Sequence, residues 1–141
     1  MNVARRHRVT DAKQHEIAIR IARHLLLAPR QERGILPNAG QFCVAGSRMI
    51  VAGEIADELA ARLTARFQSH SPAPTWAEQP GFSPIISETQ LSRIDSIVSA
   101  SRAQGGEILC GGARFDCEGS FYRPTLIAGT TPDNPAVTDE I

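Results

Sequence analysis

Two stretches of the chain repeat apolar residues at helical spacing and therefore predict helices. In residues 54–68 an apolar side chain returns at every fourth position, which places these side chains on one face of a helix. They are Ile55, Leu59, Leu63 and Phe67. Residues 88–104 carry a second apolar stripe, which ends at a Gly-Gly pair typical of a helix C-terminus. Its members are Leu91, Ile94, Ile97 and Val98. We expect two amphipathic helices, each burying one face.

Shorter apolar runs predict strands at residues 48–52, 107–110 and 121–127. A proline-rich connection over residues 69–84 separates the two helices, and Trp76 is its one large apolar anchor. Because strands alternate with helices along the chain, the pattern favours an α/β architecture with mostly parallel strand pairing.

The first 33 residues form a basic segment with a predicted helix of its own. This helix begins at Thr10 or Asp11 and ends before Pro29, with an apolar stripe along one side. Residues 1–36 carry eight Lys/Arg against three Asp/Glu, a net charge of +5, whereas residues 37–141 carry seven against twelve, a net charge of −5. A nucleic-acid-binding surface is one interpretation, but residues 1–36 contain no aromatic side chain for base stacking. A solvated helix is the simpler interpretation, and we predict no nucleic-acid partner.

Composition places the 141 residues within the range of one domain of ordinary globular character, with 42% hydrophobic and 21% charged residues. No apolar run reaches the length of a membrane span or the form of a secretory signal, so no membrane association is expected. The three cysteines are an odd number without a Cys-x-x-Cys pair. We therefore predict reduced thiols and a cytoplasmic location.

The segment with the clearest chemistry surrounds Cys43. Residues 38–48 read Asn-Ala-Gly-Gln-Phe-Cys-Val-Ala-Gly-Ser-Arg. A thiol is a useful nucleophile only as a thiolate that a substrate can reach, and the small residues on both sides leave room for approach. The backbone N–H of Cys43 could also face an oxyanion that forms on the attacked substrate. The alternative for a single cysteine is a buried, unreactive thiol.

Residues 38–48 resemble the active-site cysteine segment of the NAD(P)-dependent aldehyde dehydrogenases, with Cys43 at the position of the nucleophile. Further segments resemble motifs of that family in the same order, although Ser83 stands where the family usually has Gly. These segments are residues 83–87, 105–112, 121–126 and 139–141. The resemblance implies that residues 34–141 are part of an aldehyde dehydrogenase catalytic domain, with residues 1–33 preceding it.

The resemblance also implies a reaction and a role for two residues. The Cys43 thiolate would attack an aldehyde to give a thiohemiacetal, hydride would pass to NAD or NADP, and water would hydrolyse the resulting thioester. Glu140 matches the second glutamate of the family's Glu-Glu-Ile-Phe-Gly-Pro motif, which binds the ribose next to nicotinamide. Asn38, Gly40 and Gln41 are expected to shape the loop. Arg48 is expected to act as a structural ion-pair partner.

Other parts of the family's catalytic unit have no counterpart in these 141 residues. There is no Gly-x-Gly-x-x-Gly fingerprint, and the family's cofactor-binding domain and Glu-Leu-Gly-Gly base segment both precede its cysteine loop. We therefore expect a truncated form that is inactive, or active only in company with the missing half of the domain, with a homo-oligomer or a full-length relative as possible partners. The alternative is a non-enzymatic remnant or interaction module that associates with such a relative. Cys110 and Cys117 lack histidines at ligand spacing, so no metal site is predicted.

Overall fold

The protein is described by a computed structural model that covers residues 35–73 and 82–141. Helices and strands are both present in this part of the chain, as the sequence predicts. In chain order they are the 3₁₀ turn η2 (Pro37–Gly40), α2 (Gly53–Gln68), α3 (Glu88–Ala103), β1 (Glu107–Cys110), β2 (Leu126–Ala128) and α4 (Pro135–Thr138). The two long helices confirm the predicted ones to within a residue at each end. The predicted helix at residues 10–28 and the connection around Trp76 lie outside the described residues.

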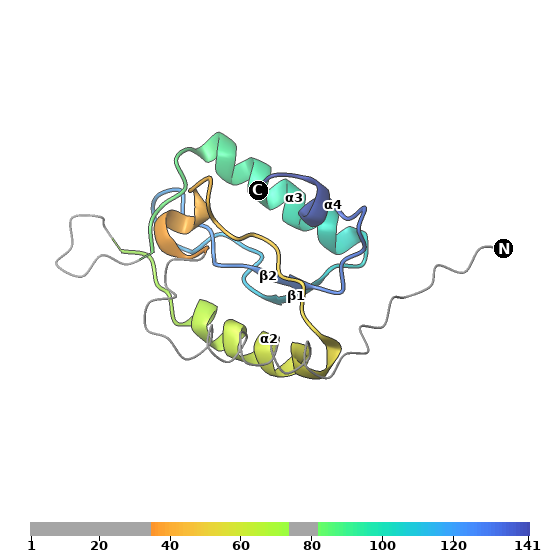
Figure 1. Ribbon diagram of the computed structural model, residues 1–141. Coiled ribbons are helices and arrows are strands. Elements are labelled where there is room, and N and C mark those ends of the chain that lie inside the picture. Colours follow the sequence, from red (N-terminus) through yellow and green to blue (C-terminus); the bar gives the residue numbers. More distant parts are fainter. Residues whose placement is uncertain (1–34, 74–81) are drawn as a thin grey trace.

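The described elements form three layers, with the two strands between helices (Figure 1). Helix α2 lies on one side of the β1–β2 pair, and α3 with the short α4 lies on the other. The centre of the core is a cluster of buried side chains from α3 and from the loops beside it. Its members are Ile85, Leu91, Val98 and Tyr122. Ile108 of β1 and Ile127 of β2 pack against this cluster, so the strands contribute apolar side chains to the α3 side.

The strands β1 and β2 pair in antiparallel fashion, with Ile108 opposite Ile127 and an irregularity in the register before Cys110. The expected parallel pairing is therefore not confirmed in the described part of the chain. The reason lies in the connection, because residues 111–125 form an irregular loop and not the crossover helix that a parallel pair usually needs. The chain reverses within this loop and returns beside the strand it left.

Two strand predictions are wrong in extent. Residues 48–52 form no strand in the described structure and lead to the start of α2 without pairing to another segment. The second, predicted at residues 121–127, is a strand only over Leu126–Ala128. Tyr122 makes an isolated bridge to Arg114, and Pro124, which has no N–H to donate, interrupts the pairing that would join the two parts. The apolar pattern locates these segments correctly, but a strand also needs a neighbouring strand with which its backbone can form hydrogen bonds.

Helix α3 is fixed at both ends by local backbone chemistry. The Ser87 hydroxyl accepts a hydrogen bond from the Gln90 N–H at 3.2 Å, which is the usual N-cap arrangement. At the other end Gly105 has φ +89°, and its N–H donates to the Arg102 carbonyl at 3.0 Å. Gly106 then passes so close to Ser101 that a Cβ at this position would lie 2.7 Å from the Ser101 Oγ. The Gly-Gly pair thus ends the helix and lets β1 begin directly beside it.

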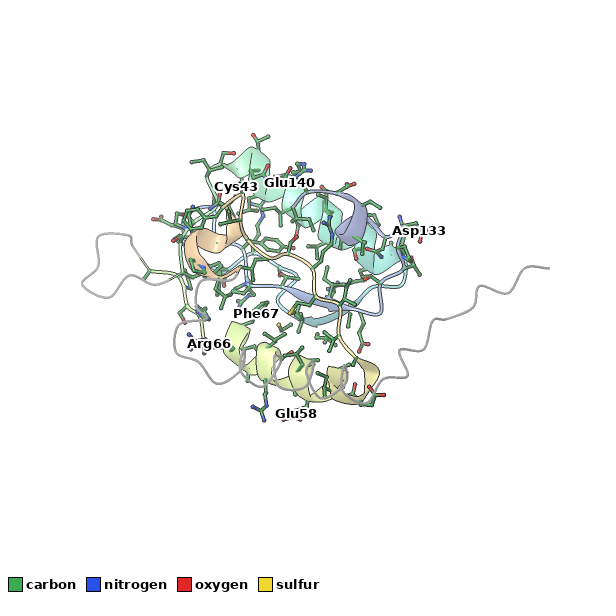
Figure 2. All side chains as sticks on the ribbon, in the orientation of Figure 1. Cys43, Glu58, Arg66, Phe67, Asp133 and Glu140 are labelled. Atoms are coloured by element: carbon green, nitrogen blue, oxygen red, sulfur yellow. The ribbon has the colours of Figure 1, made fainter. Side chains whose placement is uncertain are left out.

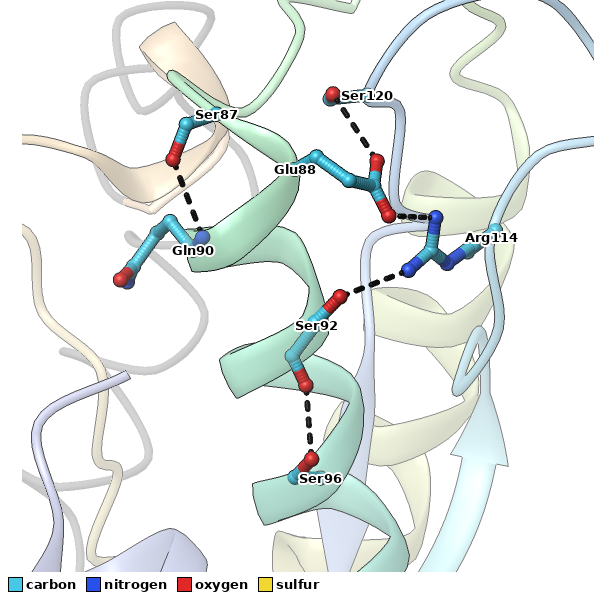
Figure 3. Close-up of polar contacts among 7 residues, drawn as sticks. All are labelled: Ser87, Glu88, Gln90, Ser92, Ser96, Arg114 and Ser120. Carbon is cyan, nitrogen blue, oxygen red and sulfur yellow. Dashed lines mark hydrogen bonds and ion pairs between the residues drawn. The ribbon is translucent and has the colours of Figure 1, made fainter.

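The loop between β1 and β2 is held to α3 by a small polar network (Figure 3). Arg114 forms an ion pair with Glu88, and its Nη2 donates to the Ser92 Oγ at 3.1 Å. The Ser120 hydroxyl donates to the other Glu88 carboxylate oxygen at 3.4 Å. These groups are largely exposed, so each contact stabilises the fold by only about 0–1 kcal/mol. Their main effect is to select where the loop lies along the helix.

Tyr122 brings the one phenol of the chain into this core. Its hydroxyl donates to the Asp95 carboxylate at 2.9 Å. Burial raises the pKa of the Tyr122 hydroxyl, and the hydrogen bond to Asp95 together with the negative charge of that carboxylate raises this pKa further. The side chain therefore stays neutral well into the alkaline range. Among the described residues, no helix is both long and apolar enough to cross a membrane.

Candidate active site around Cys43

The segment before Cys43 has an unusual backbone. Asn38, Ala39 and Gly40 follow one another with φ of 50°, 53° and 77°, all in the left-handed region. Asn and Gly adopt this region readily, but for Ala39 it costs about 1–2 kcal/mol. Gly40 is also confined in space, because a Cβ there would lie 3.1 Å from Ile35. This confirms that Asn38 and Gly40 shape the loop, as the sequence predicts.

Gln41 attaches the loop to a segment more than 40 residues away. Its Nε2 donates to the Pro84 carbonyl at 3.0 Å, and its Oε1 accepts from the Ile86 N–H at 2.8 Å. The same Nε2 also donates to the Asn38 carbonyl at 3.0 Å. The amide thus satisfies one donor and one acceptor of an extended backbone, as a neighbouring strand would. Gln41 is therefore a loop-shaping residue whose contacts use both the donor and the acceptor of its amide.

Cys43 itself lies on an exposed turn. The Ala45 N–H donates to the Phe42 carbonyl at 2.9 Å, which closes a turn with Cys43 and Val44 at its two central positions. The thiol is free and exposed, so the burial expected under the alternative interpretation is not found for this residue. Within the described residues, no carbonyl or side chain accepts from the Cys43 N–H. Both groups needed for attack on a carbonyl, a reachable sulfur and an available N–H, are present on one turn.

The chain leaves the cysteine loop beside its own C-terminal segment. The Arg48 Nη2 donates to the main-chain carbonyl of Asp139 at 3.2 Å. The expected ion pair of Arg48 is not found within the described structure, where the group it contacts is a carbonyl and not a carboxylate. The contact nevertheless joins the nucleophile segment to the residue directly before Glu140.

The C-terminal segment is positioned by a buried asparagine. Asn134 is fully buried, its Oδ1 caps α4 by accepting from the Ala136 N–H at 3.0 Å, and its Nδ2 donates to the Ser101 carbonyl at 3.1 Å. One side chain thus starts α4 and fixes it against the C-terminal end of α3. Next to it, a hydrogen bond with Thr131 lowers the pKa of the exposed Asp133 carboxyl.

Glu140 follows directly after this anchored helix and Asp139. Its side chain is exposed, and none of the described residues donates a hydrogen bond to its carboxylate. Figure 2 shows Cys43 and Glu140 on the same side of the molecule, away from α2. The Arg48–Asp139 hydrogen bond agrees with this view, because it brings the two segments together. The structure thus places both residues that the sequence singles out on one side.

The other cysteines lie apart from this arrangement. Cys110 is buried in β1, with its sulfur 4.0 Å from the Pro124 carbonyl, and Cys117 lies exposed in the β1–β2 loop. The described residues contain no group of three or more His, Cys, Asp or Glu side chains that could hold a metal ion. The chemistry of the described site is therefore that of a thiol and a carboxylate.

Sequence reasoning missed Asn134 as a residue that organises the site. The signal was present, because Asn134-Pro135 is a helix-start pair: asparagine caps, and proline suits the first helical position. The two-way contact of Gln41 had no comparable signal, since its partners are main-chain groups of a distant segment.

Comparison with known proteins identifies the family of the chain. The model of the aldehyde dehydrogenase family matches residues 13–141. The NADP(+)-dependent succinate-semialdehyde dehydrogenase of Mycobacterium leprae is 33% identical over 108 residues, which are 77% of this chain and 24% of that protein. The chain thus spans about a quarter of the length of this relative.

Two solved structures extend the comparison to the fold. The NAD-dependent aldehyde dehydrogenase of Sinorhizobium meliloti is 33% identical with a TM-score of 0.69, over 90% of this chain and 23% of that one. A betaine aldehyde dehydrogenase of Staphylococcus aureus, solved in complex with NAD+, is 30% identical with a TM-score of 0.69, over 73% of this chain and 21% of that one. The α/β arrangement of helices and strands is therefore that of part of an aldehyde dehydrogenase domain, and the chain belongs to the aldehyde dehydrogenase family.

Proposed function

We propose that this chain provides the nucleophile for the oxidation of an aldehyde with NAD or NADP as the acceptor, and that Cys43 is that nucleophile. The observation that carries the proposal is the position of Cys43, a free and exposed thiol at the centre of a fixed turn within the family's cysteine motif. The family supports an oxidoreductase. The relatives named for NADP(+) or for NAD support a nicotinamide cofactor.

The first step forms a bond between the Cys43 sulfur and the aldehyde carbon. The thiolate donates its electron pair to that carbon, and the carbonyl π electrons move to oxygen, which becomes an oxyanion. The Cys43 N–H is available to donate to this oxyanion, and in a site that excludes water one well-placed donor of this kind contributes about 3 kcal/mol to the stability of the transition state. The turn that exposes the sulfur therefore also presents the donor that the adduct needs.

The second and third steps release the product. Collapse of the oxyanion expels the hydrogen on the same carbon as hydride and leaves a thioester on Cys43. A bound nicotinamide cofactor supplies the acceptor for this hydride. Water then attacks the thioester carbon and gives up one proton to the solvent, the carbon–sulfur bond breaks, and the carboxylic acid leaves with Cys43 restored as a thiolate. These steps balance as a two-electron oxidation of aldehyde to acid.

Glu140 is the residue that we assign to the cofactor. An exposed carboxylate without a hydrogen-bond donor among the described residues fits the two hydroxyls of a ribose, each of which would donate to one oxygen. The assignment is to the ribose beside nicotinamide. Asn134 and Arg48 would hold the segment that carries Glu140 in place.

We also propose that the 141 residues oxidise aldehydes slowly, or not at all, without a further polypeptide. They correspond to about a quarter of the relatives' length. Thioester hydrolysis needs an oriented base, and hydride transfer needs a fixed cofactor. Because the members of a catalytic unit act together, losing some of them removes most of the rate. A homo-oligomer or a full-length relative is the expected setting, and the free thiols suit a reducing, cytoplasmic one.

The experiment that tests Cys43 needs no cofactor. An activated ester such as p-nitrophenyl acetate should acylate Cys43 and release a burst of p-nitrophenol close to one equivalent per chain. The Cys43→Ala variant should lose the burst. Cys117→Ala is the matched control, because Cys117 is also free and exposed, and it should keep the burst. An equal burst from Cys43→Ala would contradict the assignment of the nucleophile.

The isolated chain should in addition form no measurable NADH or NADPH from aldehydes. Robust formation by the chain alone would overturn the proposal that it needs a further polypeptide. The alternative function, a non-enzymatic module that associates with a full-length relative, is favoured by one observation: apolar side chains are exposed around the cysteine loop. A missing burst together with tight association would favour this alternative over the enzyme.

A further inference from the structure

Gln41 is the last residue before Cys43 that is hydrogen-bonded to a distant segment of the described structure. Its Nε2 donates to the Pro84 carbonyl at 3.0 Å, and its Oε1 accepts from the Ile86 N–H at 2.8 Å. Along the described chain, the next hydrogen bond to a distant segment is made by Arg48, after the thiol. The position of the Cys43 turn relative to the rest of the molecule therefore depends on these two attachments, of which Gln41 is the nearer.

The turn that carries Cys43 takes its direction from the backbone of Gln41. One backbone hydrogen bond closes the turn, from the Ala45 N–H to the Phe42 carbonyl at 2.9 Å. The side chains of Phe42 and Val44 are exposed, so neither fixes the turn to the core. A turn that is bonded only to itself can rotate as a unit about the residue that leads into it, and that residue is Gln41.

The strained backbone before Gln41 gives the amide a second task. Asn38 and Ala39 lie in the left-handed region with φ of 50° and 53°, and an alanine stays there only when its surroundings hold it. The Ala39 side chain packs against the core cluster, and the Gln41 Nε2 also donates to the Asn38 carbonyl at 3.0 Å. One amide thus holds the strained segment and joins it to residues 84–86. Loss of the amide should let this segment relax and change the direction of the turn that follows.

The direction of the turn matters for one class of reaction at Cys43 and not for another. In the displacement of iodide from iodoacetamide, the thiolate forms a bond to the CH₂ carbon and iodide leaves with its electron pair. The sulfur then needs only to be reachable. Attack on a carbonyl instead places a negative charge on oxygen, and the Cys43 N–H stabilises this charge only if the sulfur and the N–H face the same carbonyl group. The two reactions therefore distinguish an oriented thiol from a merely accessible one.

We propose that Gln41 is a positioning residue for the nucleophile: its amide holds the Cys43 sulfur and the Cys43 N–H in the orientation for attack on a carbonyl carbon. The proposal rests on the function proposed for Cys43 and adds to it a residue that acts through the turn, without contact with the reacting atoms. A residue that only stabilised the fold would change the fraction of unfolded chains. It would not change how a folded chain divides between attack on a carbonyl and displacement of iodide.

The test compares two rate constants of one thiol in the full chain with Cys117→Ala, where Cys43 is the exposed cysteine that remains. Acylation by p-nitrophenyl acetate is followed by the release of p-nitrophenolate, and alkylation by iodoacetamide is followed by mass spectrometry. Both rates are proportional to the fraction of thiolate, so their ratio does not depend on that fraction. Gln41→Met should lower the ratio of acylation to alkylation by about three- to tenfold with alkylation unchanged. The factor is modest because water competes with the N–H at an exposed turn.

Two further variants make the result specific to the amide of Gln41. Phe67→Leu is the matched control, because it loosens the core at α2, away from Cys43 in Figure 2, and it should keep the parent ratio. Gln41→Glu keeps an acceptor for the Ile86 N–H, so its ratio should fall between those of the parent and Gln41→Met. Gln41→Glu also carries the test if the circular dichroism spectrum shows that Gln41→Met does not fold.

The outcomes separate this proposal from the function on which it rests. An unchanged ratio in folded Gln41→Met would overturn the positioning role and leave Cys43 as the nucleophile. Equal losses of acylation and alkylation would also overturn it, because the substitution would then have reduced access to the sulfur and not its orientation. A parent chain that is not acylated, or acylation that persists in Cys43→Ala, would overturn both proposals.

Discussion

The attachment of the cysteine loop by Gln41 gives the sharpest test of how the site is built. Replacing this residue with methionine keeps the length of the side chain and removes both polar groups. Two hydrogen bonds between distant segments are then lost, to the Pro84 carbonyl and from the Ile86 N–H. A hydrogen bond contributes about 0.5–1.5 kcal/mol net, and both groups are partly open to water, which can replace Gln41. We expect Gln41→Met to lower the free energy of unfolding by about 1–2 kcal/mol.

Hydrogen exchange at the Ile86 amide locates this effect. That N–H donates to the Gln41 Oε1, whereas the preceding N–H, of Ile85, donates to the Ser120 carbonyl at 2.8 Å. In Gln41→Met the Ile86 amide should exchange roughly tenfold faster or more, because about 1.4 kcal/mol of local protection corresponds to a factor of ten. The exchange rate of the Ile85 amide should change only as far as the global stability of the chain changes. NMR exchange rates of a labelled chain measure both positions at once.

Two further variants distinguish the loss of the Gln41 hydrogen bonds from the general effect of replacing a glutamine by methionine. Gln41→Glu keeps an acceptor for the Ile86 N–H but places a carboxylate against the Pro84 carbonyl, so Ile86 should stay protected while overall stability falls. Gln68→Met is the matched control on an exposed helix end, and it should change neither quantity. An unchanged exchange rate at Ile86 in Gln41→Met would refute the idea that this amide fixes the loop.

Three other experiments, two substitutions and one pH titration, test the scaffold of the protein. Gly111→Ala should destabilise the fold by about 2–5 kcal/mol, because φ is +72° and the new Cβ would lie 2.2 Å from the Pro124 carbonyl oxygen; chemical denaturation measures the loss. Asn134→Ala should cost about 2–3 kcal/mol in the same assay, because it removes the cap of α4 and the hydrogen bond to Ser101. The absorbance of the tyrosinate, which reports on Tyr122 alone, should rise only well above pH 10.

The sign of the pH effect follows from the raised pKa of Tyr122. The folded state holds the phenol proton more tightly than the unfolded state, so this stabilisation is complete below the ordinary pKa of about 10 and is lost as the pH rises above it. Tyr122→Phe should remove that alkaline loss. A folded chain whose tyrosine titrates at about pH 10 would contradict the burial of the hydroxyl. For the Gly111→Ala prediction, Gly46→Ala is the matched control, because nothing lies within 4 Å of a Cβ at Gly46.

The helices could be predicted from sequence because their information is local. Four apolar residues at helical spacing define α2, and Ser87 together with the Gly105-Gly106 pair marks the ends of α3. Strand predictions depended on partners that no local pattern reveals. The apolar run at residues 48–52 was recognised, yet it has no strand neighbour in the described structure. Strand pairing depends on tertiary contacts, and these cannot be deduced from a single segment.

The candidate site divides in the same way. Cys43 and Glu140 were found from motifs, and their roles stay proposals because no contact in the structure tests them. The contacts that hold these two segments in place could not be predicted from the sequence. Gln41 and Arg48 contact main-chain carbonyls and N–H groups, which every sequence possesses. Arg48 shows the error this produces: an ion pair was expected, and the group that it contacts is the Asp139 carbonyl.

The chemistry proposed for Cys43 depends on how far its loop is open to water. The loop holds Ala39 in a left-handed conformation at a cost of about 1–2 kcal/mol, and the thiol that it presents is exposed to water. In water a hydrogen bond to an oxyanion contributes little, because solvent competes for the charge and screens it, whereas a covered site makes the same donor far more effective. The apolar residues that flank Cys43 are the ones that a covering polypeptide would meet first. Exclusion of water from the loop should therefore change the rate at which Cys43 is acylated, relative to the exposed loop of the chain alone.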